Sequence, residues 1–77
     1  MFSFFRKKRA TDELDMLITE MKQYLENNYK SLAHEARQKL GERTEQLYAE
    51  GKITQEQYHK YEAVFVEYTN KLKYYHH

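Results

Sequence analysis

The sequence between residues 47 and 58, LYAEGKITQEQY, contains a helix stop followed at once by a helix start. Gly51 suits the left-handed backbone conformation that ends many helices. Thr54 and Gln57 have the spacing of a capping box, and Ile53 and Tyr58 have the spacing of a hydrophobic staple. These signals are independent of one another. Together they predict a tight turn over residues 51–54 and a helix over about 55–75.

Upstream of this turn, apolar residues recur every three or four positions, which is typical of one face of an α-helix. Thr11 is a suitable N-cap, so the helix is predicted to run from about residue 12 to residue 50. Arg43 is the one interruption. The apolar stripe consists of Leu14, Ile18, Met21, Leu25, Tyr29, Leu32, Ala36, Leu40 and Leu47.

The middle of this predicted helix contains residues that favour a break. Asn27 and Asn28 are poor helix formers, and Ser31 is able to cap a restarted helix. Against a break, the stripe keeps its phase and repeats every eleven residues, as a nearly straight helix requires. We predict one continuous helix, with a three-helix bundle broken near Asn27–Ser31 as the alternative. The eleven-residue repeat comprises Leu14, Leu25, Ala36 and Leu47.

The predicted helices differ in length, at about 58 Å and about 32 Å. The second carries its own stripe and covers the first only from about Leu47 to Tyr29. The uncovered part needs a partner, so an all-α hairpin that dimerises into a bundle is expected, with a helix of another protein as the alternative. The second stripe consists of Tyr58, Tyr61, Phe65, Tyr68, Leu72 and Tyr75, and the predicted interface of Leu14, Leu17, Ile18, Met21 and Leu25.

Size and composition narrow the possible classes. The 77 residues suffice for one domain, predicted as a tail over 1–10 and a helical domain over 11–77. Cysteine is absent, which excludes disulfides and thiolate chemistry. No apolar run approaches the roughly 20 residues of a transmembrane helix, and no signal peptide is recognisable, so a cytoplasmic location is expected.

Charge is divided unevenly along the chain. Residues 1–9 contain four basic and no acidic side chains, whereas the remainder contains nine basic and twelve acidic ones. Aromatic rings beside basic residues are typical of a peripheral anchor at the inner, anionic face of a membrane. Alternatively, the rings cap the open end of the bundle, or the basic cluster contacts nucleic acid. The residues concerned are Phe2, Phe4, Phe5, Arg6, Lys7, Lys8 and Arg9.

Catalytic and cofactor signals are weak. His59 and Glu62 have a spacing that can frame a metal ion on a helix, but no second such pair accompanies them. No nucleophile–histidine–acid pattern or glycine-rich phosphate loop is present. We therefore expect no enzyme activity, no metal and no cofactor. Gly41 lies within a predicted helix, where it suits a close approach of a second helix beside Leu40.

Residues Leu47–Tyr58 resemble the helical hairpin of the short bacterial C-terminal domains called SHOCT, in which a leucine-rich helix precedes glycine, Ile-Thr, acidic residues and an aromatic residue. The resemblance covers this dozen residues, and the second helix here is longer and richer in tyrosine. It implies a hairpin used in protein association. We expect a small interaction module, an adaptor or regulator, with a nucleic-acid-associated accessory protein as the alternative.

Overall fold

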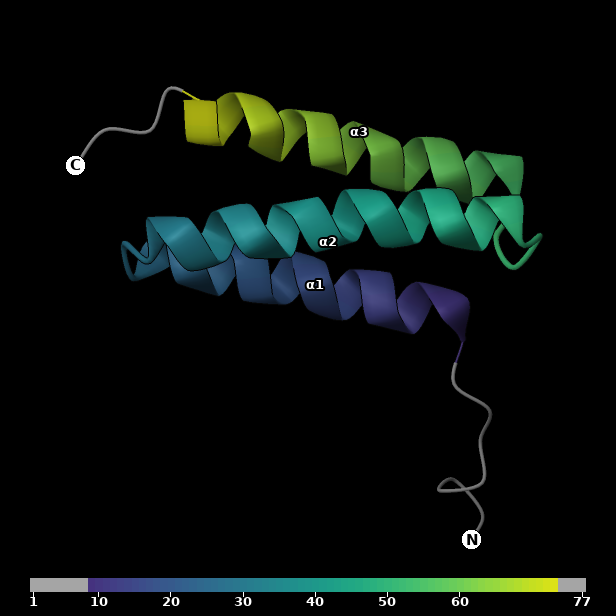
Figure 1. Ribbon diagram of the computed structural model, residues 1–77, viewed down its shortest axis with the longest axis horizontal. Coiled ribbons are helices and arrows are strands. Elements are labelled where there is room, and N and C mark those ends of the chain that lie inside the picture. Colours follow the sequence, from purple (N-terminus) through teal and green to yellow (C-terminus); the bar gives the residue numbers. More distant parts are fainter. Residues whose placement is uncertain (1–8, 74–77) are drawn as a thin grey trace, which may run out of the picture.

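The computed structural model describes residues 9–73, which form three helices and no strand. The helices are α1 (Ala10–Glu26), α2 (Lys30–Ala49) and α3 (Gln55–Lys73). Successive helices run in opposite directions, and α2 lies between α1 and α3 and packs against both (Figure 1). The architecture is a slab of 45 × 29 × 15 Å.

The continuous helix predicted over residues 12–50 is wrong, because the chain reverses at Asn27–Tyr29. Asn28 adopts a left-handed backbone conformation with φ 63°. Its N–H donates to the carbonyl of Leu25 (3.2 Å), and the Tyr29 N–H donates to the carbonyl of Tyr24 (2.7 Å). These two bonds form a Schellman motif, which satisfies the last carbonyls of α1. The alternative of three helices therefore describes the fold.

The second turn ends α2 in the same way and then starts α3. Gly51 has φ 72°, and its N–H and that of Lys52 donate to carbonyls in the last turn of α2 at 3.0 and 2.9 Å. The predicted capping box is present. The Thr54 N–H donates to the Gln57 side chain (2.8 Å), and the Gln57 N–H donates to the Thr54 hydroxyl (3.0 Å).

The core takes side chains from all three helices, so the chain covers the apolar residues that were predicted to be uncovered. Leu14, Leu17 and Met21 are buried, and Ile18 and Leu25 are partly buried against the same core. The fold-back of α1 onto α2 supplies this cover. The predicted dimer interface at these five residues therefore loses the reason for which it was inferred.

The start of α1 also differs from the prediction. The helix begins at Ala10 rather than after Thr11, and the carboxylate of Asp12 accepts a hydrogen bond from the Arg9 backbone N–H at 3.0 Å. An acidic residue in the first turn also interacts favourably with the helix dipole. Within residues 9–73, no helix has the length and apolar character that crossing a membrane requires.

Candidate interaction groove

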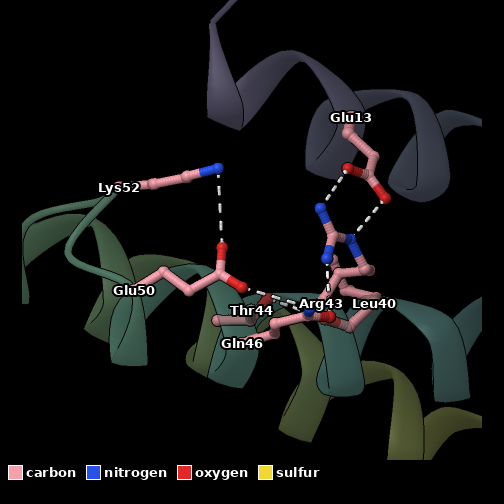
Figure 2. Close-up of polar contacts among 7 residues, drawn as sticks. All are labelled: Glu13, Leu40, Arg43, Thr44, Gln46, Glu50 and Lys52. Atoms are coloured by element: carbon pink, nitrogen blue, oxygen red, sulfur yellow. Dashed lines mark hydrogen bonds and ion pairs between the residues drawn. The ribbon is translucent and has the colours of Figure 1, made fainter.

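Arg43 joins α2 to α1 (Figure 2). Its Nε and Nη2 atoms donate to the Glu13 carboxylate at 2.7 and 3.0 Å, and its Nη1 atom donates to Gln46 at 2.6 Å. The hydrogen bond to Glu13 is the main cause that raises the pKa of Arg43. Arg43, which interrupts the apolar stripe, therefore forms a bidentate ion pair with Glu13 of the neighbouring helix.

Two tyrosine hydroxyls connect α3 to the other helices. Tyr61 donates to Asp15 of α1 at 2.6 Å, and Tyr58 donates to Glu45 of α2 at 2.6 Å. Burial is the main cause that raises the pKa of Tyr61 to about 12, and the hydrogen bond to Asp15 is the second cause. The hydrogen bond to Glu45 is the main cause that raises the pKa of Tyr58 to about 12. Both phenols therefore act as hydrogen-bond donors that hold the helices together.

A groove of about 460 Å³ runs between α2 and α3 on a side to which α1 contributes no residue. We call it the α2–α3 groove. Its floor consists of buried or half-buried residues, and its rim of exposed ones. The floor contains Gly41, Thr44 and Phe65, the rim contains Gln38, Glu42, Glu45, Glu62 and Val66, and Arg37 lines one side.

The floor depends on the missing side chain of Gly41. A Cβ atom at this position would lie 2.6 Å from Cε1 of Phe65, well inside van der Waals contact. The glycine therefore allows the Phe65 ring to lie against the backbone of α2, as the close approach expected at this position requires. Thr44 adds no free donor, because its hydroxyl donates to the Leu40 carbonyl at 2.7 Å (Figure 2). The floor is consequently apolar.

The rim of the groove is acidic. Three carboxylates line it, against the single guanidinium of Arg37. The Gln38 amide donates to Glu42 at 3.3 Å, and the Tyr58 hydroxyl donates to Glu45. Because these two donors are neutral, they leave the negative charge of both carboxylates in place. An apolar floor beneath such a rim suits a ligand that combines apolar and positively charged groups.

Arg37 is held inside the groove wall. Its guanidinium lies 5.3 Å from the centroid of the Phe65 ring, and Nη1 donates to the Thr69 hydroxyl at 3.0 Å. Its Nε is buried and has no hydrogen-bond partner among the described residues. The contact over the ring is a cation–π interaction, which fixes the ring and the guanidinium relative to each other.

Most of the predicted tail lies outside the described residues. Arg9 is described, and its guanidinium lies 3.4 Å from the Asp12 carboxylate. His59 Nδ1 lies 3.7 Å from Glu62, and no group of three or more potential metal ligands occurs within residues 9–73. The predicted residues outside this range are Phe2, Phe4, Phe5, Arg6, Lys7 and Lys8 at one end and Tyr75 at the other.

Sequence reasoning did not find the groove. Its signals were a glycine within α2 and an apolar residue, Val66, that falls off the apolar stripe of α3 and is 50% exposed. Neither signal shows alone that Gly41 and Phe65 face each other, because that depends on how α2 and α3 pack.

No family model matches the chain, and no curated protein or solved structure matches it. The resemblance of residues 47–58 to the SHOCT hairpin therefore stays an expectation from the sequence.

Proposed function

We propose that this protein is a small non-enzymatic interaction module, an adaptor or regulator, whose α2–α3 groove binds an apolar and positively charged segment of a partner. The observation that carries the proposal is the combination of an apolar floor with an acidic rim. Phe65 and Val66 offer apolar surface, and Glu42, Glu45 and Glu62 surround it with negative charge.

The arrangement of the helices supports a helical partner. The α2–α3 pair receives α1 on one side, and the groove leaves the other side open. A helix laid in such a groove would complete a four-helix arrangement, the usual way in which paired helices bury a second face. Apolar side chains of the partner would contact Phe65 and Val66, and its lysine or arginine residues would meet the rim.

A labelled model peptide tests this function. The probe is an amphipathic helix of about 18 residues, with leucine on one face and lysine on the other. We expect fluorescence anisotropy to show saturable binding that weakens as salt concentration rises. Val66→Asp and the pair Glu42→Lys with Glu45→Lys should each weaken binding about tenfold or more. Glu26→Lys, at an exposed position of α1 away from the groove, is the control and should have little effect.

The outcome that contradicts the proposal is equally specific. Equal affinity for the wild type and the rim variant would show that the rim carboxylates do not contact the peptide. A loss of affinity per reversed charge that is the same in the rim variant and in the control would show that the peptide binds by general charge attraction. A scrambled peptide of the same composition, unable to gather its leucines on one face, should bind at least about tenfold more weakly if apolar contact with the floor matters.

The N-terminal tail supports a second candidate function, attachment to an anionic membrane surface. Its three phenylalanines and four adjacent basic residues combine the two attractions that hold peripheral proteins at lipid headgroups. Flotation with anionic and with neutral vesicles tests it. Replacing the phenylalanines at positions 2, 4 and 5 by serine should abolish binding. A salt-dependent shift of DNA or RNA without vesicle binding would instead favour the nucleic-acid alternative.

A further inference from the structure

The α2–α3 groove and the N-terminal segment of this chain are chemically complementary. The groove combines the half-buried Phe65 and the exposed Val66 with three rim carboxylates. The segment over residues 2–9 reads FSFFRKKR, three phenylalanines followed by four basic residues. Each property that the groove requires of a ligand is therefore present within eight residues of the same polypeptide.

The segment is also long enough to reach the groove. Arg9 lines a shallow hollow together with Arg43, on the side of α2 that faces α1. Glu42 directly precedes Arg43 in α2 and belongs to the groove rim. The path between the two sides is about half the circumference of one helix, roughly 15–19 Å for a helix about 10–12 Å across. The seven extended residues from Arg9 back to Phe2 span up to about 25 Å, and the five back to Phe4 span up to about 18 Å.

Covalent attachment favours this occupant over a free one. A segment tethered by a few residues has an effective concentration in the millimolar range, provided that the tether spans the two sites. A contact that is too weak to detect between separate molecules is then largely formed when both binding surfaces belong to the same molecule. On the basis of the proposed groove, we infer that residues 2–8 of this chain bind the α2–α3 groove of the same molecule, with phenylalanines on the floor and basic residues at the rim.

The consequence is a competition for one segment. While the tail occupies the groove, a partner segment has to displace it, and an anionic surface that attracts the tail opens the groove. Partner binding at the groove and attachment of the tail to an anionic surface are then coupled. A bound partner frees the tail for the surface, and a surface that holds the tail frees the groove for the partner.

Paramagnetic broadening tests the position of the tail in the full chain. The protein contains no cysteine, so Ser3→Cys carries a nitroxide label at one site only. We expect amide signals of Gly41, Glu45 and Val66 to be broadened at low salt. The pair Glu42→Lys with Glu45→Lys should remove this broadening, whereas the pair Glu20→Lys with Glu26→Lys on α1 should leave it.

Two further measurements keep the inference open to refutation. In a mixture of isotope-labelled wild type and unlabelled spin-labelled protein, broadening should be absent, since its presence would place the tail of a second copy in the groove. In Phe4→Ser with Phe5→Ser, the affinity for the leucine–lysine probe should rise by about three- to tenfold, because the internal competitor is weakened.

The inference and the proposed function fail in different ways. Probe binding that is sensitive to Val66→Asp but unchanged by the phenylalanine substitutions, with no broadening at the groove, overturns the tail as occupant and leaves the groove as a binding site. Absence of both broadening and probe binding overturns the two together.

Discussion

Asn28 and Gly51 hold equivalent positions at the ends of α1 and α2, with φ of 63° and 72°. Each is the first residue beyond the helix cap, and each lies in a Schellman motif with the same pair of backbone hydrogen bonds. An asparagine and a glycine therefore adopt the same left-handed backbone conformation at the two helix ends. Tyr24 and Tyr29 complete the first motif with an aromatic contact, their ring centroids being 6.5 Å apart.

Because Asn28 and Gly51 are equivalent, substitutions at the two positions should affect stability through the same backbone conformation. Asn28→Gly should raise the free energy of unfolding by up to about 1 kcal/mol, because glycine adopts positive φ without the strain of a Cβ atom. Asn28→Ala and Gly51→Ala should each lower it by about 1 kcal/mol. Urea denaturation measures all three. If Asn28→Gly were instead as destabilising as Asn28→Ala, the backbone conformation would not be what the asparagine supplies.

Gly41 and Phe65 give a prediction in which two effects oppose each other. Gly41→Ala gains about 1 kcal/mol of helix propensity but places a methyl group against the Phe65 ring, and overpacking of this kind typically costs about 1–3 kcal/mol. We expect a net loss of stability in the wild type. In a Phe65→Ala background the same change should become stabilising by about 1 kcal/mol. A double-mutant cycle with no coupling would contradict the observed approach.

The Arg43–Glu13 pair should contribute modestly, because both side chains are about one-third exposed. Arg43→Lys loses the two-pronged geometry, and we expect Tm to fall by no more than about 5 °C. The loss should shrink at about 1 M salt, where screening acts over about 3 Å. Glu67→Gln, which alters the exposed contact with Lys71 at 3.5 Å, is the control and should leave Tm nearly unchanged.

High pH should weaken the fold through Tyr58 and Tyr61. Both have a pKa of about 12 in the folded protein, above the value of about 10 for a tyrosine in an unfolded chain. Their contribution to stability is therefore complete below about pH 10 and is lost as pH rises toward 12. The free energy of unfolding, measured across this pH range, should fall less steeply in the double variant Tyr58→Phe with Tyr61→Phe than in the wild type. Tyr29→Phe, at a position 56% exposed, is the control.

Because the chain covers its own α1 residues, we expect light scattering to report the mass of one chain, 9.5 kDa. Ile18→Asp should lower stability by about 1–3 kcal/mol without changing the mass. A dimer that Ile18→Asp dissociates into folded monomers would restore the interface expected from the sequence.

The turn at residues 51–54 was predictable because its signals are local. Glycine, the capping pair and the flanking apolar residues each act within a few positions of the turn. The break at Asn28 was predicted only as the alternative, because the apolar phase passes through it unchanged. Tyr29 and Leu32 continue the stripe in the sequence, yet they are 56% and 42% exposed. Period alone does not distinguish a continuing helix from two helices that share a core.

The groove and the Arg43 ion pair depend on packing between helices, so neither followed from the sequence. Arg43 was visible only as an interruption, and its partner Glu13 lies thirty positions away. Val66 was visible only as an apolar residue outside the stripe. Both became interpretable when the registers of α1 and α3 against α2 were known.

The central position of α2 also leads to an expectation for how this chain folds. Each helix packs mainly against the helix that precedes or follows it in the sequence, and turns of only a few residues join the helices. Proteins dominated by such local contacts fold in microseconds to milliseconds. The α1–α2 and α2–α3 hairpins share α2, so we expect either hairpin to nucleate the native structure. A chain that folds rapidly in this way would expose its apolar surface to aggregation only briefly.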